Sequence, residues 1–220
     1  MPTSRPSEHH DAILDQFTRQ ATPFATAPGI RDETALRLIL EASGAGPDDT
    51  VLDVACGPGL VVAAFARGRA WPDASFSIVT SRFAFHHFLD PLAVLREMRR
   101  VAAPGGRVVV VDSTPDTRCA DAFNRMERLR DPSHVRSLPV DEHRELYATV
   151  GLPEPRVTSY RLEGEMEALI GRSFPNPGDD EKIRQIFRAA LTDDALDIQP
   201  RLEAGQIRYG FPVSVLVADR

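Results

Sequence analysis

The chain contains little cysteine and almost no lysine. Cys56 and Cys119 are its two cysteines, too few for a disulfide framework, which predicts a reducing, cytoplasmic environment. Lys182 is the one lysine, so arginine carries nearly all the positive charge, a bias we attribute to genome composition. The net charge of −6 argues against a large nucleic-acid-binding surface.

Long hydrophobic runs are also absent from the sequence. No stretch approaches the roughly 20 apolar residues that a membrane-spanning helix needs. Residues 1–17 lack the basic and then apolar pattern of a secretory signal, so we expect none. No cysteine and histidine residues have the spacing of metal ligands, and the pair His9 and His10 is too short for a metal site. These absences favour a protein without a membrane span or a bound metal.

The remaining composition is 42% hydrophobic and 26% charged, and 220 residues suit one domain with a full core. Strand-like and helix-like segments alternate, which predicts an α/β fold with a mostly parallel sheet and helices on both faces. We expect a single domain over 1–220, with a helical N-terminal cap (8–46), a sheet core (51–112) and a C-terminal part with lid helices (113–220). Helices are expected at 8–26, 31–42, 60–67, 90–102, 117–130, 141–149 and over most of 164–196; strands are expected from 51 and at 76–80, 107–112, 157–162 and 207–218, the last interrupted near Pro212.

The segment Val51 to Leu60, with the sequence VLDVACGPGL, is the most informative part of the chain. A short apolar strand carries Asp53 near its end, breaks into a turn of small residues and reopens as a helix. Glycines allow a ligand to approach the backbone, and the free N–H groups of the helix start point toward it. This turn therefore predicts a nucleotide-like cofactor.

The same segment resembles the first motif of class I S-adenosylmethionine-dependent methyltransferases. Its usual form is a strand with an acidic residue followed by G-x-G-x-G, and here Ala55 replaces the first glycine while Gly57 and Gly59 are retained. An NAD-dependent oxidoreductase fits less well, because Val62 stands where the dinucleotide fingerprint requires its third glycine.

Segments further along the chain are similar to one branch of that class, the quinone-biosynthesis C-methyltransferases. The stretch from Trp71 to Asp112 contains FAFHHF and a PGG turn before an all-valine strand, and resembles the family's fourth strand, its helix and its fifth strand. RDPSHVR at 130–136 and the final FPVSVLVADR also fit. The resemblance implies a Rossmann-like methyltransferase fold from about Asp11 to the end.

One departure from the family concerns strands two and three. About 50 residues that would form them, with the acidic residue that holds the ribose, have no counterpart between Ala66 and Trp71. Without these strands the family order 3-2-1-4-5-7-6 becomes 1-4-5-7-6, a sheet shortened at one edge. A right-handed step from the first strand to the fourth also requires that the helix change faces. We therefore expect a folded domain with weakened affinity for the cofactor.

The resemblance implies a set of residues for S-adenosylmethionine. Asp53 is expected to meet the amino group of its methionine part, and residues past the fourth strand are expected to lie behind the cofactor. The full cofactor set is Asp53, Ala55, Cys56, Gly57, Pro58, Gly59, Ser81 and Arg82.

The acceptor side of the site contains histidines. His86 and His87 are catalytic candidates because imidazole titrates near neutral pH and can take a proton from the acceptor; packing or capping is the alternative role. Asp131 and His134 are candidates for the acceptor pocket, with a structural loop contact as their alternative.

The function that follows is a methyltransferase acting on a small-molecule acceptor. Its rival is a non-catalytic Rossmann-like relic that serves as a binding or dimerisation module. The intact turn and the FHHF segment favour the enzyme, and the missing ribose carboxylate favours the relic. The sequence does not decide between a monomer and a homodimer.

Overall fold

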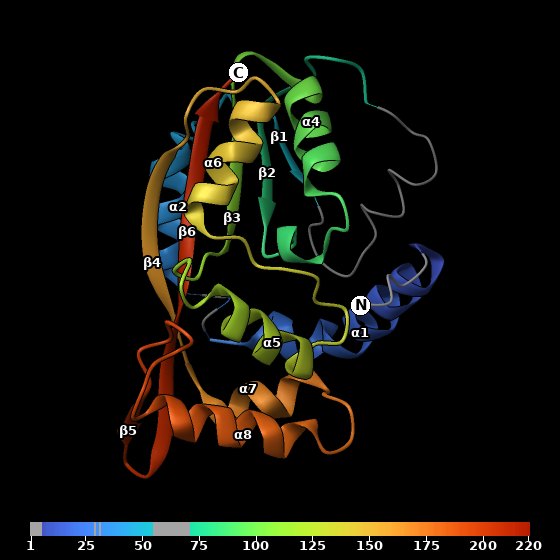
Figure 1. Cartoon of the computed structure of the whole chain (residues 1–220). Coiled ribbons are helices and arrows are strands. Elements are labelled where there is room, and N and C mark those ends of the chain that lie inside the picture. The colour runs from blue at the N-terminus through green and yellow to red at the C-terminus, as the bar shows by residue number, and fades with distance from the viewer. Residues whose placement is uncertain (1–5, 29, 31, 55–70) are drawn as a thin grey trace.

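The computed structural model of the chain describes residues 6–28, 30, 32–54 and 71–220, and a mixed six-stranded sheet lies at its centre (Figure 1). The strand order is β1-β2-β3-β6-β4, and the short β5 pairs with β6. This is the predicted order of a sheet shortened at one edge, with β1 at the edge of the described strands. The strands are β1 (Val51–Val54), β2 (Phe76–Arg82), β3 (Ala102–Ser113), β4 (Arg156–Glu165), β5 (Arg201–Glu203) and β6 (Gln206–Asp219).

The sheet combines parallel and antiparallel pairs. β1, β2 and β3 run parallel, whereas β6 is antiparallel to β3, β4 and β5. The Rossmann-like fold class is confirmed: among the described strands β6 alone runs against the common direction, because β4 and β5, antiparallel to β6, point the same way as β1, β2 and β3. A sheet without strands two and three has fewer parallel pairs, so the antiparallel β6 dominates its other half.

Helices cover both faces of the sheet, as predicted. α4 and α6 pack on one face through their buried residues Leu95, Met98 and Tyr147. α2 packs on the other face, against the valines of β3 and β6. The predicted helix over 60–67 lies outside the described residues. The described helices are α1 (Pro6–Thr26), α2 (Glu33–Ser43), the 3₁₀ turn η1 (Phe85–His87), α4 (Pro91–Val101), α5 (Ala120–Arg130), α6 (Val140–Thr149), α7 (Met166–Ser173) and α8 (Asp179–Ala190).

A second hydrophobic core lies beyond the end of the sheet. The long strands β4 and β6 continue past β3 and support α5, α7 and α8, which form a lid below the sheet in Figure 1. Ile183 and Phe187 of α8 are fully buried in this core. None of the helices in the described parts of the chain is both long and apolar enough to cross a membrane.

The last strand is continuous through Pro212, contrary to the predicted interruption. Pro212 pairs with Arg161 of β4, and its carbonyl accepts a hydrogen bond from the N–H of Thr114 (2.8 Å). In a strand, the carbonyl and the N–H of one residue point to the same side. For Pro212, which has no N–H, that side faces Thr114, just past the end of β3. The proline therefore costs the sheet little pairing, and β6 passes through it.

The predicted turn Pro104-Gly105-Gly106 forms an irregularity inside β3. Ala102 pairs with Phe76 and Arg107 pairs with Ile78, so the extra residues of β3 bulge out of the ladder. Gly105 has φ of 74°, which favours glycine. The bulge fixes the register in which the following valines, 108–111, pair with β2.

Gly164 is a position where a small side chain is required. It pairs with Tyr209, and a Cβ atom added at Gly164 would lie 2.4 Å from Cζ of that buried ring. We expect Gly164→Ala to lower the free energy of unfolding by about 1–3 kcal/mol, because the ring must shift within a packed core.

Urea unfolding of Gly164→Ala and of a control variant, Gly171→Ala, measures the change in the free energy of unfolding. In Gly171→Ala, on α7, the new Cβ meets no atom within 4 Å, so this control should keep or raise stability. Equal stability of Gly164→Ala and the parent chain would contradict the packing described.

Candidate active site

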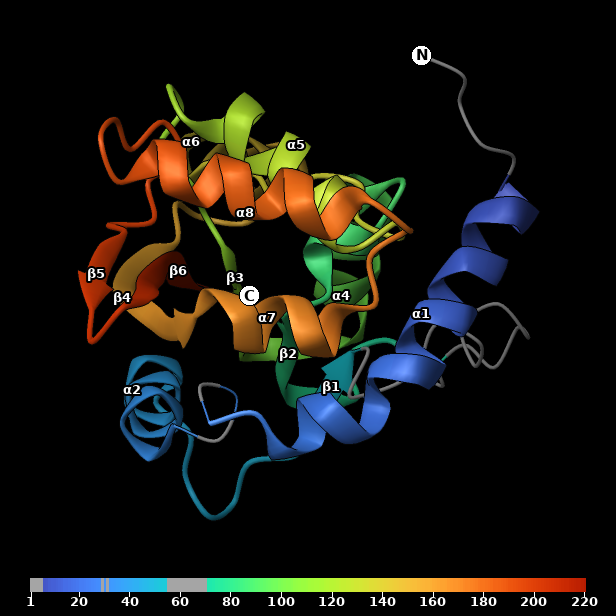
Figure 2. The same cartoon turned by 90° about the horizontal axis from the view of Figure 1, so that it is seen from below.

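The candidate site lies at the carboxyl ends of β2 and β3. Parallel strands place these ends at the same edge of the sheet, where open α/β sheets bind their ligands. The lid helices lie across this end, and α1 runs beside them, as Figure 2 shows from below. The arrangement brings residues from β3, η1, the 131–134 loop and the lid to one place.

His86 and Asp112 form a buried pair at this edge. The left-handed backbone of Phe83 (φ 52°) turns the chain after β2, and Phe85 anchors η1 in the core. Asp112, near the end of β3, then accepts hydrogen bonds from the His86 backbone N–H (3.1 Å) and from its Nδ1–H (2.5 Å). Two bonds to one carboxylate fix the orientation of the imidazole ring.

The charge of Asp112 determines how His86 titrates. Burial by itself lowers the pKa of His86, but the charge and hydrogen bond of Asp112 outweigh it, so the pKa is raised. Burial opposes the ionised form of Asp112, yet His86 and the N–H of Ser113 lower the pKa of that carboxyl. The pair therefore holds a basic imidazole against an ionised carboxylate.

His87 has the opposite character. Its Nδ1–H donates to the carbonyl of Ser133 (3.0 Å), and its ring meets Phe17 of α1 edge-on at 5.0 Å between centroids. Burial, followed by the charge of His86, lowers the pKa of His87 to about 3. His87 is therefore neutral at physiological pH. Because the pKa values of the two imidazoles are shifted in opposite directions, the two side chains suit different roles. His86 can exchange a proton, and His87 can accept a hydrogen bond.

The 131–134 loop supports both histidines. Asp131 accepts bonds from the N–H and hydroxyl of Ser133 (2.9 and 2.6 Å), which positions the carbonyl that binds His87. His134 stacks on His86 with ring centroids 5.3 Å apart and donates Nε2–H to Asn124 (2.7 Å). Asp131 lines the pocket, whereas His134 lies behind His86 and is not among the lining residues.

A cavity of about 70 Å³ borders the two histidines. Neither Nε2 atom has a hydrogen-bond partner in the described part of the chain, which leaves both for a ligand. Apolar and aromatic side chains form most of the wall, and a buried ion pair between Glu127 and Arg130 (2.6 Å) lies at one side. The apolar lining is Phe17, Ala27, Ile30, Phe83, Leu162, Leu169, Phe211 and Val213, with Tyr209 beside them.

Helix α1 closes this cavity with a few polar contacts. Gln16 and Gln20 both donate to the carbonyl of Ser173 at the end of α7, and Gln20 also donates to Asp131 (3.3 Å). His9 forms a hydrogen bond with the backbone carbonyl of His87 (2.9 Å). The cavity is smaller than usual for small-molecule sites.

The predicted cofactor residues are only partly described. Asp53, near the end of β1, is exposed and pairs with Thr80, and Ser81 pairs with Val54, the last residue before the glycine turn. The hydroxyl of Ser81 is buried without a hydrogen-bond partner among the described residues, so it is free for a ligand. The predicted residues Ala55, Cys56, Gly57, Pro58 and Gly59 lie outside the described part.

Arg82 has a structural contact that sequence reasoning did not foresee. Its Nη2 donates to the carbonyl of Ile30 (3.1 Å), and its guanidinium lies 4.8 Å from the centre of the Phe83 ring. As neighbours in a strand, Ser81 and Arg82 point to opposite faces of the sheet. The structure therefore does not bring these two predicted residues together.

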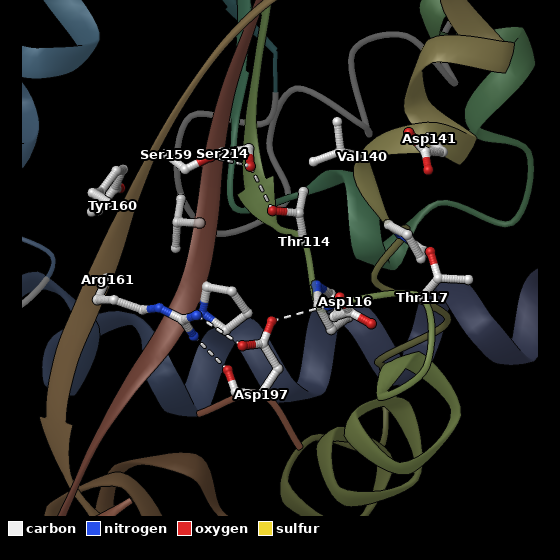
Figure 3. A pocket seen from close by; sticks show the side chains of 14 residues that line it. Thr114, Asp116, Thr117, Val140, Asp141, Ser159, Tyr160, Arg161, Asp197 and Ser214 are labelled. Carbon is white, nitrogen blue, oxygen red and sulfur yellow. Dashed lines mark hydrogen bonds and ion pairs between the residues drawn. The ribbon is translucent and has the colours of Figure 1, made fainter. Parts of the chain in front are cut away.

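A second, wider pocket of about 430 Å³ lies between α6, β4 and β6 (Figure 3). Its polar groups satisfy one another: the hydroxyls of Thr114 and Ser214 bond at 2.7 Å, and Asp197 binds both Arg161 (2.8 Å) and the N–H of Asp116 (3.0 Å). It contains no histidine. The histidine cavity is therefore the stronger candidate for chemistry. Among the described residues, no group of three or more metal-ligand side chains could hold a metal ion.

Sequence reasoning missed Asp112 and the Glu127–Arg130 pair. A signal existed for Asp112, because an acidic residue near the end of a buried strand is the feature that singled out Asp53. No sequence pattern shows that Asp112 faces a histidine 26 residues earlier. Glu127 and Arg130 look like an ordinary helical charge pair, and only the lid buries them.

Comparison with known proteins supports the resemblance seen in the sequence. A family model described as a methyltransferase domain matches residues 61–110. The chain is 35% identical over 134 residues to the Bacillus subtilis methyltransferase YcgJ, itself uncharacterised, covering 60% of this chain and 53% of YcgJ. The crystal structure of YcgJ matches with a TM-score of 0.72 at 24% identity, over 85% of this chain and 98% of that one, and confirms the fold.

A second relative indicates that the chain is shortened within the stretch that it matches. It is 33% identical over 109 residues to a demethylmenaquinone methyltransferase of Mycobacterium sp., covering 35% of this chain and 47% of the relative. Since 35% of 220 residues is about 77, about 32 aligned positions of the relative have no counterpart here. The chain thus spans about half the length of these curated relatives and contains a gap against one of them.

Proposed function

We propose that this chain, a relative of the class I S-adenosylmethionine-dependent methyltransferases, transfers a methyl group from S-adenosylmethionine to a small-molecule acceptor. The observation that carries the proposal is the His86–Asp112 pair, whose free Nε2 borders a cavity at the carboxyl edge of the sheet. A buried carboxylate that orients a histidine is a general-base arrangement. The sequence relatives support the reaction class.

The residues present fit the methionine end of the cofactor. Asp53 and Ser81 lie at the carboxyl ends of the neighbouring strands β1 and β2, where the carboxylate and the free hydroxyl would bind polar groups of the cofactor. S-adenosylmethionine, when bound, supplies an electrophilic methyl group on its sulfonium. We assign Arg82, which points to the other face of the sheet, a structural role through its bond to the Ile30 carbonyl.

The acceptor side would work by proton removal and exclusion of water. Nε2 of His86 takes the proton of the acceptor's nucleophilic group, and Asp112 stabilises the imidazolium that forms. His87 offers a neutral Nε2 that orients the acceptor, and Asp131 holds the loop that fixes His87. Phe17 and the lid helices exclude water around the reacting groups. His134 supports His86 from behind.

One observation favours a second function, a non-catalytic binding module or homodimer subunit. The gap of about 32 positions against the mycobacterial relative agrees with loss of the strand that carries the ribose carboxylate. Such a loss weakens the cofactor site without disturbing the histidine cavity. We therefore propose an enzyme that binds S-adenosylmethionine weakly and still transfers its methyl group.

The test is transfer of label from methyl-labelled S-adenosylmethionine to a library of small hydroxylated compounds, followed by mass spectrometry. We expect one or more compounds to gain a methyl group at saturating cofactor. The absence of a methylated product from well-folded protein at millimolar cofactor would support the non-catalytic alternative.

A further inference from the structure

Arg172 is a cation on the wall of the acceptor cavity without an acidic partner. It lies in the last turn of α7, and its Nη2 donates to the hydroxyl of Tyr209 (3.3 Å). No carboxylate forms an ion pair with it in the described part of the chain. Its remaining N–H donors are therefore available, and the side chain is only partly exposed.

The other charged groups around the cavity already have partners. Arg130 binds Glu127 through two hydrogen bonds of 2.8 and 2.6 Å. Asp131 accepts from Ser133 and Gln20. Glu163 accepts from Arg201 (2.7 Å), outside the cavity. Of the two arginines that line the cavity in the described part of the chain, Arg130 is paired with Glu127 and Arg172 has no carboxylate partner.

A guanidinium in this setting selects an anion. Its planar fork matches the two oxygens of a carboxylate, and a charge-assisted bond is stronger where water is scarce. The apolar wall beside it, with Leu169 and Phe211, would hold a hydrocarbon or aromatic body. His86 stands on another wall of the same cavity.

We propose that the acceptor is an organic anion: a hydroxylated carboxylate whose carboxylate binds Arg172 and whose hydroxyl group faces His86. This inference rests on the proposed function, because it assigns the substrate class of the same site. The cavity of about 70 Å³ holds about five water-sized volumes, so the acceptor is compact.

The experiment compares 4-hydroxybenzoate with its neutral analogue 4-hydroxybenzamide by ligand-observed NMR titration of the whole chain without cofactor. We expect the acid to bind about ten-fold or more tightly than the amide. Arg172→Gln should abolish that preference, and Arg172→Lys should retain part of it. The control is Arg128→Gln, an exposed arginine outside the cavity, which should keep the full preference.

Equal binding of the two probes, or no binding of either, would overturn the proposal. So would a preference for the acid that persists in Arg172→Gln. The comparison in the parent chain requires no variant, so it decides the matter even if Arg172→Gln does not fold. Because cofactor is absent, failure here leaves methyl transfer standing, and that reaction is tested separately by the label assay.

Discussion

Replacing His86 by Gln is expected to lower kcat of methyl transfer by about 10²- to 10⁴-fold, the usual contribution of a general base. Glutamine retains polarity and approximate size but cannot accept the proton at neutral pH. The measurement is single-turnover transfer from labelled cofactor to an acceptor found in the library. His10→Gln, on α1 and outside the cavity lining, is the matched control and should keep the parent rate. A kcat of His86→Gln within three-fold of the parent value would exclude His86 as the general base.

Asp112→Asn tests the positioning role of the carboxylate. A base acts when neutral, so the parent rate should rise with pH through the raised pKa of His86. Without the charge of Asp112, burial dominates and lowers that pKa, so the rise should move to lower pH while the maximal rate falls. Histidine side-chain NMR gives the same shift without an acceptor. An unchanged pKa of His86 in Asp112→Asn would contradict the pairing.

Stability is expected to fall steeply as the pH drops from about 6.5 to about 4.5. Burial lowers the pKa of three histidines: His87 to about 3, His143 to about 4, and His134 well below its ordinary value. In this window the unfolded chain binds protons that the folded chain excludes, so unfolding is favoured. Three such groups give a slope of up to about 4 kcal/mol per pH unit. His86, whose pKa is raised, is largely protonated in the folded chain throughout this window, so it offsets the loss only near pH 6.5, where the unfolded histidine is still titrating.

His143→Leu isolates one part of that slope. His143 is 1% exposed, and neither ring nitrogen has a hydrogen-bond partner among the described residues. Its replacement should reduce the slope by about one proton, measured by urea unfolding at several pH values. The control is Tyr147→Phe, one turn along α6, which loses a bond to the carbonyl of Leu216 (3.2 Å) and should lower stability equally at every acidic pH. A slope unchanged by His143→Leu would show that His143 is charged in the folded chain.

The strand order could be predicted from the sequence because each core strand is a short apolar run with a clear end. The valine run before Asp112 and the run from Val51 both identify buried strands. Removal of the family's strands two and three, which lie at one edge, leaves the order of the other strands unchanged. The length of β6 could not be predicted. Pro212 is tolerated only because β3 ends beside it, which is a property of the neighbouring strand.

The sequence predicted which residues lie together at the candidate site, but not the different chemical role of each. His86, His87 and Asp131 all come to one cavity, as expected for the carboxyl edge of a sheet. Adjacent histidines look equivalent in a sequence, however. Asp112 makes His86 basic, whereas burial and the charge of His86 keep His87 neutral, and both environments arise through tertiary packing. His134 illustrates the same limit, since its contact with Asn124 turns it away from the cavity lining.

Binding of S-adenosylmethionine to this chain, measured by isothermal titration calorimetry, tests the central claim most directly. We expect saturable but weak binding, because loss of a ribose carboxylate costs about 1.5–3 kcal/mol, or roughly 10- to 150-fold in affinity. Asp53→Asn should weaken it further, since the carboxylate would hold the methionine amino group. Absence of saturable binding would contradict a methyltransferase site, and low-micromolar affinity would contradict a site weakened by the missing strands.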